Sequence, residues 1–316
     1  MSVLLTGSIA YDTVLSHEGT FARQFVETNL ANLNTTFLAR GMRRDFGGCA
    51  ANIAVSMKRL GGDPVLWGAV GTDGDAYLER FRSMGIRTDG IAKLEDAYTA
   101  QCFILTDANG CQLGAFHPGA TERTPEVPWP VIDGEKVRPT VAILSPGGRA
   151  TTLHAAKACT ERGVPYIFDV GQELPLFSGR ELTEILMGSI GIAYSEYESQ
   201  LFEAATGLSP AAIAAKGKFV LRTLGKKGAE LLEAGTATPQ FIETVPVKAV
   251  SAVGAGDAMR GGLLAGLSMG LSLLESARLG AVASAHKVAA ATAQDYQLDL
   301  ETARRDYASV WGEAPF

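Results

Sequence analysis

The sequence predicts an α/β fold in which a mostly parallel sheet carries helices on both faces. Short apolar runs alternate with segments of helical length, most regularly from Val141 onward, and this alternation is typical of βαβ units. The runs are almost continuously apolar, as expected of strands buried on both faces of a parallel sheet. With 316 residues, 47% of them hydrophobic, the chain can form one large domain, or one domain with a smaller piece.

The N-terminal elements carry the first candidate ligand-binding residue. Residues 3–5 form a short buried strand that ends in a turn, and residues 9–12 continue it. Asp12 is therefore expected at the carboxyl end of a strand, where open α/β sheets bind ligands, and it is a candidate for gripping hydroxyl groups. The alternative role for Asp12 is capping of a turn.

A pair of glycines precedes the first long helix. Gly47 and Gly48 would let a ligand approach the backbone closely, and Asn52 on the first turns offers both a donor and an acceptor. The alternative is an ordinary loop-to-helix junction with a capping Asn. Gly61-Gly62 ends the helix.

Two segments leave the alternating pattern. Residues 16–44 have weak periodicity and end in a basic cluster that we expect to be solvated, and Asn109-Gly110 between two apolar runs predicts a β-hairpin. We expect lid segments at about 13–45 and 98–118, inserted in a single domain over 1–316, to close over a site. Phe116 could face a planar ligand there, although filling the core is the ordinary role of a Phe.

The remaining elements continue the alternation. Residues 219–224 form a strand that runs into a glycine turn with Lys226 and Lys227, which could hold a phosphate tail or be a surface loop. The other strands are expected at about 64–70, 90–92, 100–105, 112–116, 141–144, 166–169 and 190–193, and helices at about 73–84, 151–162, 180–186, 273–291 and from 300.

The stretch 251–266 carries the strongest chemical signal. Gly254 and Gly256 allow a turn that brings backbone N–H groups together at a helix start, where an anion is favoured. Asp257 beside such a site could take a proton while charge develops on a neighbouring phosphoryl group. The alternative is that Asp257 only favours the first helical turn and that the glycines only permit tight packing.

Other nucleotide motifs do not fit. A dinucleotide fingerprint would need glycine at Met259 and would follow the first strand, and a P-loop would need Ser or Thr after Gly217-Lys218 or Gly225-Lys226.

Composition narrows the possible partners and compartment. The net charge of −6 argues against a nucleic-acid or anionic-membrane surface. Four cysteines without C-x-x-C or zinc spacing are interpreted as reduced thiols, and no basic leader or bilayer-spanning run is found. We therefore expect a cytoplasmic protein that acts on a small molecule, as a monomer or a homodimer.

The ordered set of these motifs resembles the ribokinase-like (PfkB) carbohydrate kinase family, and within it the bacterial adenosine kinases and broader nucleoside kinases. The resemblance covers nearly the whole chain. It rests on the segments 7–12, 46–52, 116–120, 168–172, 223–225 and 254–260.

The resemblance implies a doubly wound sheet with a small β lid, and a role for each motif. Asp257 would deprotonate a 5′-hydroxyl, and the backbone of Ala255 and Gly256 would form the anion hole, with Gly254 beside them in the same catalytic motif. The implied substrate-binding residues are Asp12, Gly47, Gly48, Asn52, Phe116 and Gln172, and the implied ATP-binding residues are Thr223, Gly225 and Gly228. Mg²⁺ bridging the ATP phosphates is implied, with Glu198 reaching it through water.

Four positions depart from the family pattern. Ser195 stands where the family has Asn, and Ser251 and Val253 stand where it has Asp and Thr, which puts a monovalent-cation site in doubt. Cys49 replaces the lysine of ribokinases, which favours nucleosides over free sugars. The expected activity is ATP-dependent phosphorylation of adenosine or a wider nucleoside set. The alternatives are a kinase for ribose or a hexose and a nucleoside-binding sensor without catalysis.

Overall fold

The central sheet is built from strands in nearly sequential order on either side of β1. The computed structural model describes residues 2–25, 35–132 and 134–316. Within these ranges nine strands form one sheet, in the order β15-β14-β13-β12-β11-β10-β1-β4-β5. All neighbours from β13 to β5 are parallel, and β14 and β15 add an antiparallel end. The strands are β1 (Ser2–Thr6), β4 (Asp63–Val70), β5 (Ile91–Lys93), β10 (Val141–Leu144), β11 (Tyr166–Asp169), β12 (Gly191–Ser195), β13 (Phe219–Thr223), β14 (Ala229–Leu232) and β15 (Gln240–Ile242).

Two helical layers cover this sheet, as the alternating pattern predicts. Successive side chains of a strand point to opposite faces, so Val3 and Leu5 belong to one core cluster and Leu4 to the other. The first layer holds α2 (Cys49–Arg59), α3 (Asp75–Ser83), α8 (Ala255–Met269), α9 (Leu273–Val288) and α10 (Leu300–Trp311). The second holds α4 (Arg149–Glu161), α5 (Gly179–Gly188), α6 (Glu196–Thr206) and α7 (Pro210–Ala215), with the 3₁₀ helices η2 (Gly119–Glu126) and η3 (Gly171–Leu176).

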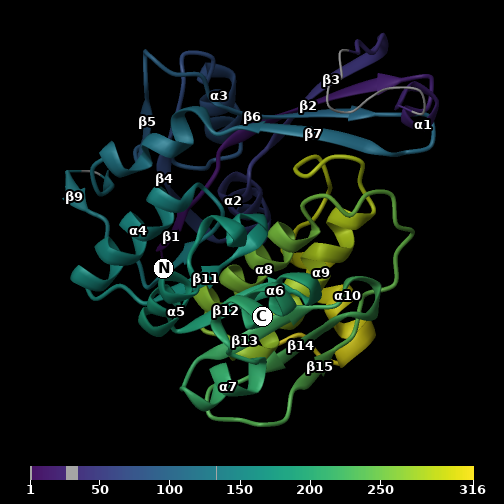
Figure 1. Cartoon of the computed structure of the whole chain (residues 1–316). Helices are drawn as coiled ribbons and strands as arrows, with labels where there is room; N and C mark the ends of the chain where they lie inside the picture. Colours follow the sequence, from purple (N-terminus) through teal and green to yellow (C-terminus); the bar gives the residue numbers. More distant parts are fainter. Residues whose placement is uncertain (1, 26–34, 133) are drawn as a thin grey trace.

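A second sheet projects beyond the helices (Figure 1). It has the order β3-β2-β6-β7 and contains β2 (Ala10–His17), β3 (Ala39–Gly47), β6 (Ala100–Thr106) and β7 (Gln112–His117). The predicted hairpin at Asn109-Gly110 is the β6–β7 connection, and β6 pairs with β2. The short elements are α1 (Phe21–Phe25), the pair β8 (Val131–Ile132) and β9 (Glu135–Lys136), and η4 (Gly225–Lys227). Residues 26–34 of the predicted lid segment lie outside the described residues.

The prediction that residues 9–12 continue the first strand was wrong. β1 ends at Thr6, and β2 begins at Ala10 in the other sheet. Gly7 has φ +144°, and its Cα leaves too little room for a Cβ beside Ser145, so the chain turns from one sheet to the other at this glycine. Within the described ranges, no helix has both the length and the apolar composition needed to cross a bilayer.

The packing of α8 on α9 depends on a glycine contact. A Cβ added at Gly262 would lie 2.6 Å from the Cα of Gly280 and 2.7 Å from the carbonyl oxygen of Leu279. Because backbone atoms cannot give way as a side chain can, Gly262→Ala should force the helices apart.

We expect Gly262→Ala to lower the free energy of unfolding by about 1–3 kcal/mol, although Ala has a better helix propensity than Gly by about 1 kcal/mol. Urea unfolding followed by circular dichroism would measure it. The matched control is Gly114→Ala on β7, where the nearest atom to a new Cβ is 4.0 Å away. Equal stability of the two variants would contradict the expectation.

Candidate active site

The start of α8 lies on a glycine turn that leaves two backbone donors free. Gly254, the N-cap residue, has φ +78°, in the left-handed region that favours glycine. The N–H of Ala255 donates to the carbonyl oxygen of Ala252, so of the predicted pair Ala255 and Gly256 only Gly256 has a free N–H. Among the described residues, the N–H groups of Gly256 and Asp257 have no acceptor. This helix start therefore offers two donors and the positive end of a helix dipole to an anion.

Asp257 is held beside these donors by the amide of Asn52. Asn52 Nδ2 donates to Asp257 Oδ2 at 2.7 Å, joining the first turn of α8 to the first turn of α2. Burial raises the pKa of Asp257, whereas hydrogen bonds from Asn52 and Cys49 and the charge of Arg260 lower it. A carboxylate with a raised pKa that is fixed in direction is suited to accept a proton.

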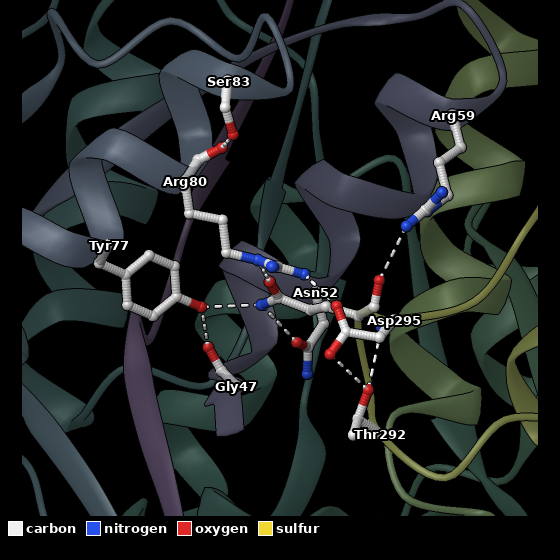
Figure 2. A network of polar contacts seen from close by, with 9 residues as sticks. Gly47, Asn52, Arg59, Tyr77, Arg80, Ser83, Thr292 and Asp295 are labelled. Atoms are coloured by element: carbon white, nitrogen blue, oxygen red, sulfur yellow. Dashed lines mark hydrogen bonds and ion pairs between the residues drawn. The ribbon is translucent and has the colours of Figure 1, made fainter. Parts of the chain in front are cut away.

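A buried network fixes the orientation of Asn52. Gln294 Nε2 donates to Asn52 Oδ1 at 2.9 Å and to the Tyr77 hydroxyl at 2.7 Å, and Tyr77 donates to the carbonyl oxygen of Gly47 at 2.5 Å. Because Asn52 Oδ1 accepts from Gln294, its Nδ2 must face Asp257. Arg80 Nε donates in turn to Gln294 Oε1 at 3.1 Å. Figure 2 shows this network, in which Asn52, Tyr77, Gly47 and Arg80 lie close together.

Neither Tyr77 nor Gln294 was predicted from the sequence as a site residue. Tyr77 lies in α3, and Gln294 follows α9 in a segment without a recognisable motif. Gln294 stands between Ala293 and Asp295, so its immediate neighbours do not indicate burial, although it is 1% exposed. A buried amide needs partners, but the sequence does not say which ones.

Asp12 approaches the same site from the second sheet. It is the third residue of β2, directly beside Gly47, where a Cβ would lie 2.3 Å from Asp12 Oδ2. Gly48, the N-cap of α2, has φ +88° and no room for a side chain because Ser8 O would lie 2.5 Å from a Cβ. The paired glycines thus admit the carboxylate of Asp12 and the turn at Ser8.

Burial raises the pKa of Asp12 to about 6, and the charges of Asp45 and Asp257 add to the effect. The folded protein therefore binds a proton at Asp12 more tightly than the unfolded chain does, and ionisation of Asp12 costs stability as the pH rises through 6.

We expect Asp12→Asn to raise the free energy of unfolding by about 1–3 kcal/mol above pH 7, with little gain near pH 4.5. The range allows for partial solvent exposure of the side chain. Urea unfolding of both proteins between pH 4.5 and 7.5 would measure the difference. Asp63→Asn, at the exposed N-terminal end of β4, is the control and should give no such pH-dependent gain. A constant difference across the pH range would contradict the expectation.

Phe116 lies in line with Asp12 across the second sheet. Asp12 on β2 is paired with Cys102 on β6, and Cys102 is paired with Phe116 on β7. Laterally paired residues share a face, so the ring of Phe116 lies on the face that carries Asp12, two strand spacings or about 10 Å away. Phe116 is 51% exposed, so the ordinary expectation of core filling was wrong.

Gln172 makes no hydrogen bond to the other predicted site residues within the described ranges. It is exposed on η3, after the carboxyl end of β11, and has no hydrogen-bond partner among the described residues. Its neighbour Glu173 is anchored, because it accepts from the N–H groups of Gly147 and Gly148.

A buried ion pair lies behind Asp257. Arg260, one turn further along α8, donates to Asp169 Oδ1 at 3.0 and 3.2 Å, and both side chains are about 95% buried. Burial raises the pKa of Asp169 to about 6, and the charge of Asp257 raises it further, while Arg260 lowers it. The positive charge of Arg260 therefore lies near two carboxylates, Asp169 at the end of β11 and Asp257 at the start of α8.

Thr223, Gly225 and Gly228 line a cavity of about 480 Å³ that reaches the start of α8. Gly228 has φ +109°, and a Cβ there would lie 2.2 Å from the carbonyl oxygen of Ile242. One end of the cavity is formed by Ala255 and Gly256. The rest of the lining is largely apolar, with Val245, Pro246, Val247, Ala249, Met259, Ala281, Ala285 and Val288. A planar apolar group with an anionic tail would fit, the tail reaching the free N–H groups.

Glu198 caps a helix near the site. Its side chain accepts from the N–H of Ser195 at 2.7 Å, and the Ser195 hydroxyl accepts from the N–H of Glu198, which is a capping box at the start of α6. Serine at position 195 thus serves as the N-cap. Within the described ranges, no group of three or more His, Cys, Asp or Glu side chains is arranged to hold a metal ion. A single carboxylate still fits Mg²⁺ held mainly by substrate phosphates and water.

Comparison with known proteins gives one consistent result. Residues 17–299 match the family described as pfkB family carbohydrate kinase. The structure is similar to that of the nucleoside kinase of Burkholderia thailandensis in complex with inosine, with 34% identity, a TM-score of 0.87 and 99% of each chain covered, and that protein has also been solved with ADP and inosine. The nucleoside kinase of Methanothermobacter thermautotrophicus is 26% identical over 99% of this chain and 97% of its own. Fructokinase-2 of Solanum habrochaites is 28% identical over 72% of this chain and 74% of its own.

Proposed function

This chain belongs to the pfkB family of carbohydrate kinases, and we propose that within it the chain is an ATP-dependent nucleoside kinase that phosphorylates the ribose 5′-hydroxyl of adenosine or a wider nucleoside set. One observation carries the proposal. Asp257, held by Asn52, directly follows Gly256 in the wall of the cavity at Thr223, and its charge acts on Asp12 of the second sheet.

The row on the second sheet supports a nucleoside as the acceptor. Asp12 as a carboxylate accepts hydrogen bonds from ribose hydroxyls, beside the backbone of Gly47 and Gly48. The ring of Phe116, about 10 Å away, is placed for a base, and a free pentose or hexose would be too short to reach both. Gln172 is proposed to lie near the base at the margin of the site. The relatives that act on nucleosides support the same choice.

The transfer step follows from the geometry at the start of α8. The 5′-oxygen forms a bond to the γ-phosphorus of ATP, the bond from that phosphorus to the β-γ bridging oxygen breaks, and ADP leaves. Asp257 takes the hydroxyl proton as the new bond forms. The N–H groups of Gly256 and Asp257 donate to the phosphoryl oxygens, where charge is greatest in the transition state. Thr223, Gly225 and Gly228 lie along the ATP phosphates.

Mg²⁺ would be held by the ATP phosphates, with Glu198 reaching it through water, and would supply charge neutralisation on those phosphates. The second sheet would act as a lid over the acceptor, which keeps water from competing for the phosphoryl group. All four cysteines are free thiols, which supports a reducing compartment such as the cytoplasm.

The test is ADP release by the purified protein with Mg-ATP across adenosine, inosine, guanosine, cytidine, ribose and fructose. Release with nucleosides alone is expected. Release with ribose or fructose alone would overturn the proposal in favour of a sugar kinase, the alternative that the fructokinase relative supports. Nucleoside binding in calorimetry without ADP release would indicate a sensor.

A further inference from the structure

Lys287 is a fully buried lysine that no step of the proposed transfer uses. It lies in the last turn of α9, and its side chain is 0% exposed. Its Nζ donates to the carbonyl oxygen of Ser251 at 2.9 Å and is 3.4 Å from that of Ala290. Lysine is among the residues least often buried without a counter-ion, so this placement needs an explanation.

The surroundings of Lys287 hold the ammonium through dipoles. Within the described ranges, no ion pair joins Lys287 to a carboxylate. The acceptors are two backbone carbonyl oxygens, that of Ser251 in the segment before α8 and that of Ala290 just beyond the end of α9. The dipole at the C-terminal end of α9 also favours a cation there. Burial lowers the pKa of Lys287, and the charge of Asp257 opposes this effect. A cation surrounded by backbone carbonyls is the arrangement in which proteins also bind alkali-metal ions.

The carbonyl of Ser251 belongs to the segment that forms the anion site. The N–H groups of Val250 and Ser251 both donate to the carbonyl oxygen of Val288, at 2.8 and 3.1 Å. Three hydrogen bonds therefore hold residues 250–251 against the end of α9, three residues before Gly254. Ala252, Ala255, Gly256 and Val288 all line the nucleotide-sized cavity. A displacement of Ser251 would therefore move the turn that aims the two free N–H groups.

We propose that Lys287 is a positioning residue whose buried ammonium acts as a built-in monovalent cation, fixing residues 250–254 and adding positive potential to the anion site, so that the enzyme needs no K⁺ or Na⁺. The proposal rests on the proposed kinase function and deepens it. An external cation would require the ammonium of Lys287 to vacate the carbonyl of Ser251. Asp at position 251 is not required, because the backbone of Ser251 is the ligand.

The first arm of the test uses the unmodified protein. Its turnover in tetramethylammonium buffer should change less than about twofold when 100 mM K⁺, Na⁺ or NH₄⁺ is added. Activation of tenfold or more by K⁺ would overturn the proposal, and this arm does not depend on whether any variant folds.

The second arm replaces Lys287. Lys287→Met keeps the length of the side chain and removes the charge, so kcat should fall about 10–100-fold with KM for the nucleoside little changed. Lys287→Ala should lower kcat to a similar extent, but the shorter side chain leaves space for a cation. Adding NH₄⁺, K⁺ or methylammonium should therefore raise kcat at least fivefold in Lys287→Ala and should not do so in Lys287→Met. The matched control is Lys218→Met, since Lys218 also donates to a backbone carbonyl, that of Ser189, at the other end of the sheet, and should keep its turnover.

A folded Lys287→Met with unchanged kcat, or a folded Lys287→Ala that no cation activates, would overturn the proposal. Calorimetric ADP binding separates this result from a failure of the kinase function. If the unmodified protein turns over no acceptor, the proposed function fails, and ADP binding still tests the inference. Binding should then weaken about 5–10-fold in Lys287→Met and recover with NH₄⁺ in Lys287→Ala only, and equal binding by all three proteins would count against it.

Discussion

Asp257→Asn is expected to lower kcat for the preferred nucleoside by about 10³-fold, with KM for nucleoside and ATP changed less than about threefold. Asn has the shape of Asp but cannot take the hydroxyl proton, and general base catalysis contributes about 10²–10⁴-fold. The uncharged amide of the variant should also leave Asp169 as the nearer negative partner of Arg260, without the second charge at position 257. Steady-state kinetics with Mg-ATP at pH 8 would measure it, because burial raises the pKa of Asp257 and a higher pH favours its carboxylate form.

Asp63→Asn is the control for this experiment as well, because it makes the same chemical change at the opposite edge of the sheet. Its kinetics should equal those of the unmodified enzyme. If Asp257→Asn retained more than about a tenth of the turnover while remaining folded, Asp257 would not be the base, and the proton would have to leave by another route.

Arg260→Met should produce the largest loss of stability, about 3–5 kcal/mol, with a fall in Tm on the order of 10 °C. The change leaves Asp169 buried without its ion-pair partner and next to the charge of Asp257. The pKa of Asp169 in the folded state would then lie further above its value in the unfolded chain. Protonation of Asp169 removes the cost of its buried, unpaired charge. The loss should be greater at pH 8 than at pH 5.5. Thermal unfolding at the two pH values would measure both.

The double variant Asp169→Asn with Arg260→Met separates an unpaired charge from lost packing. It should recover roughly half of the stability lost by Arg260→Met and should lose the pH dependence. Arg180→Met, which breaks an exposed pair with Glu184, is the control and should leave Tm unchanged. A double variant no more stable than Arg260→Met would mean that packing of the arginine stem, and not the charge of Asp169, accounts for the loss.

The sequence predicted most of the central sheet because its strands carry local signals. Apolar runs such as 141–144 and 166–169 match β10 and β11, and the start of α2 at Cys49 follows from Gly47-Gly48. The failure at residues 9–12 has a physical reason: two apolar runs separated only by Thr6-Gly7-Ser8 belong to different sheets, and nothing local marks which sheet a strand will join.

Gly254, Asp257 and Asn52 could be named as candidates from the sequence because each stands in a motif of glycines and polar residues. Lys287 and Gln294 were not predictable because each acts through partners distant in the sequence. A lysine in the last turn of a helix is expected because the helix dipole favours a cation there. Its presence therefore does not indicate a contact with Ser251.

The hydrogen bonds of Asn52 also set the order in which the protein can become functional during synthesis. Its two partners, Asp257 and Gln294, lie 205 and 242 positions later in the chain. A ribosome releases the N-terminal residues first, so a nascent chain that already carries Asp12, Gly47 and Asn52 lacks both of these partners of the amide until residue 294 has emerged. Nucleoside or ATP in the surrounding solution can therefore stabilise the finished protein but not its growing precursors, and chains that stop short of position 294 should gain no protection from either ligand.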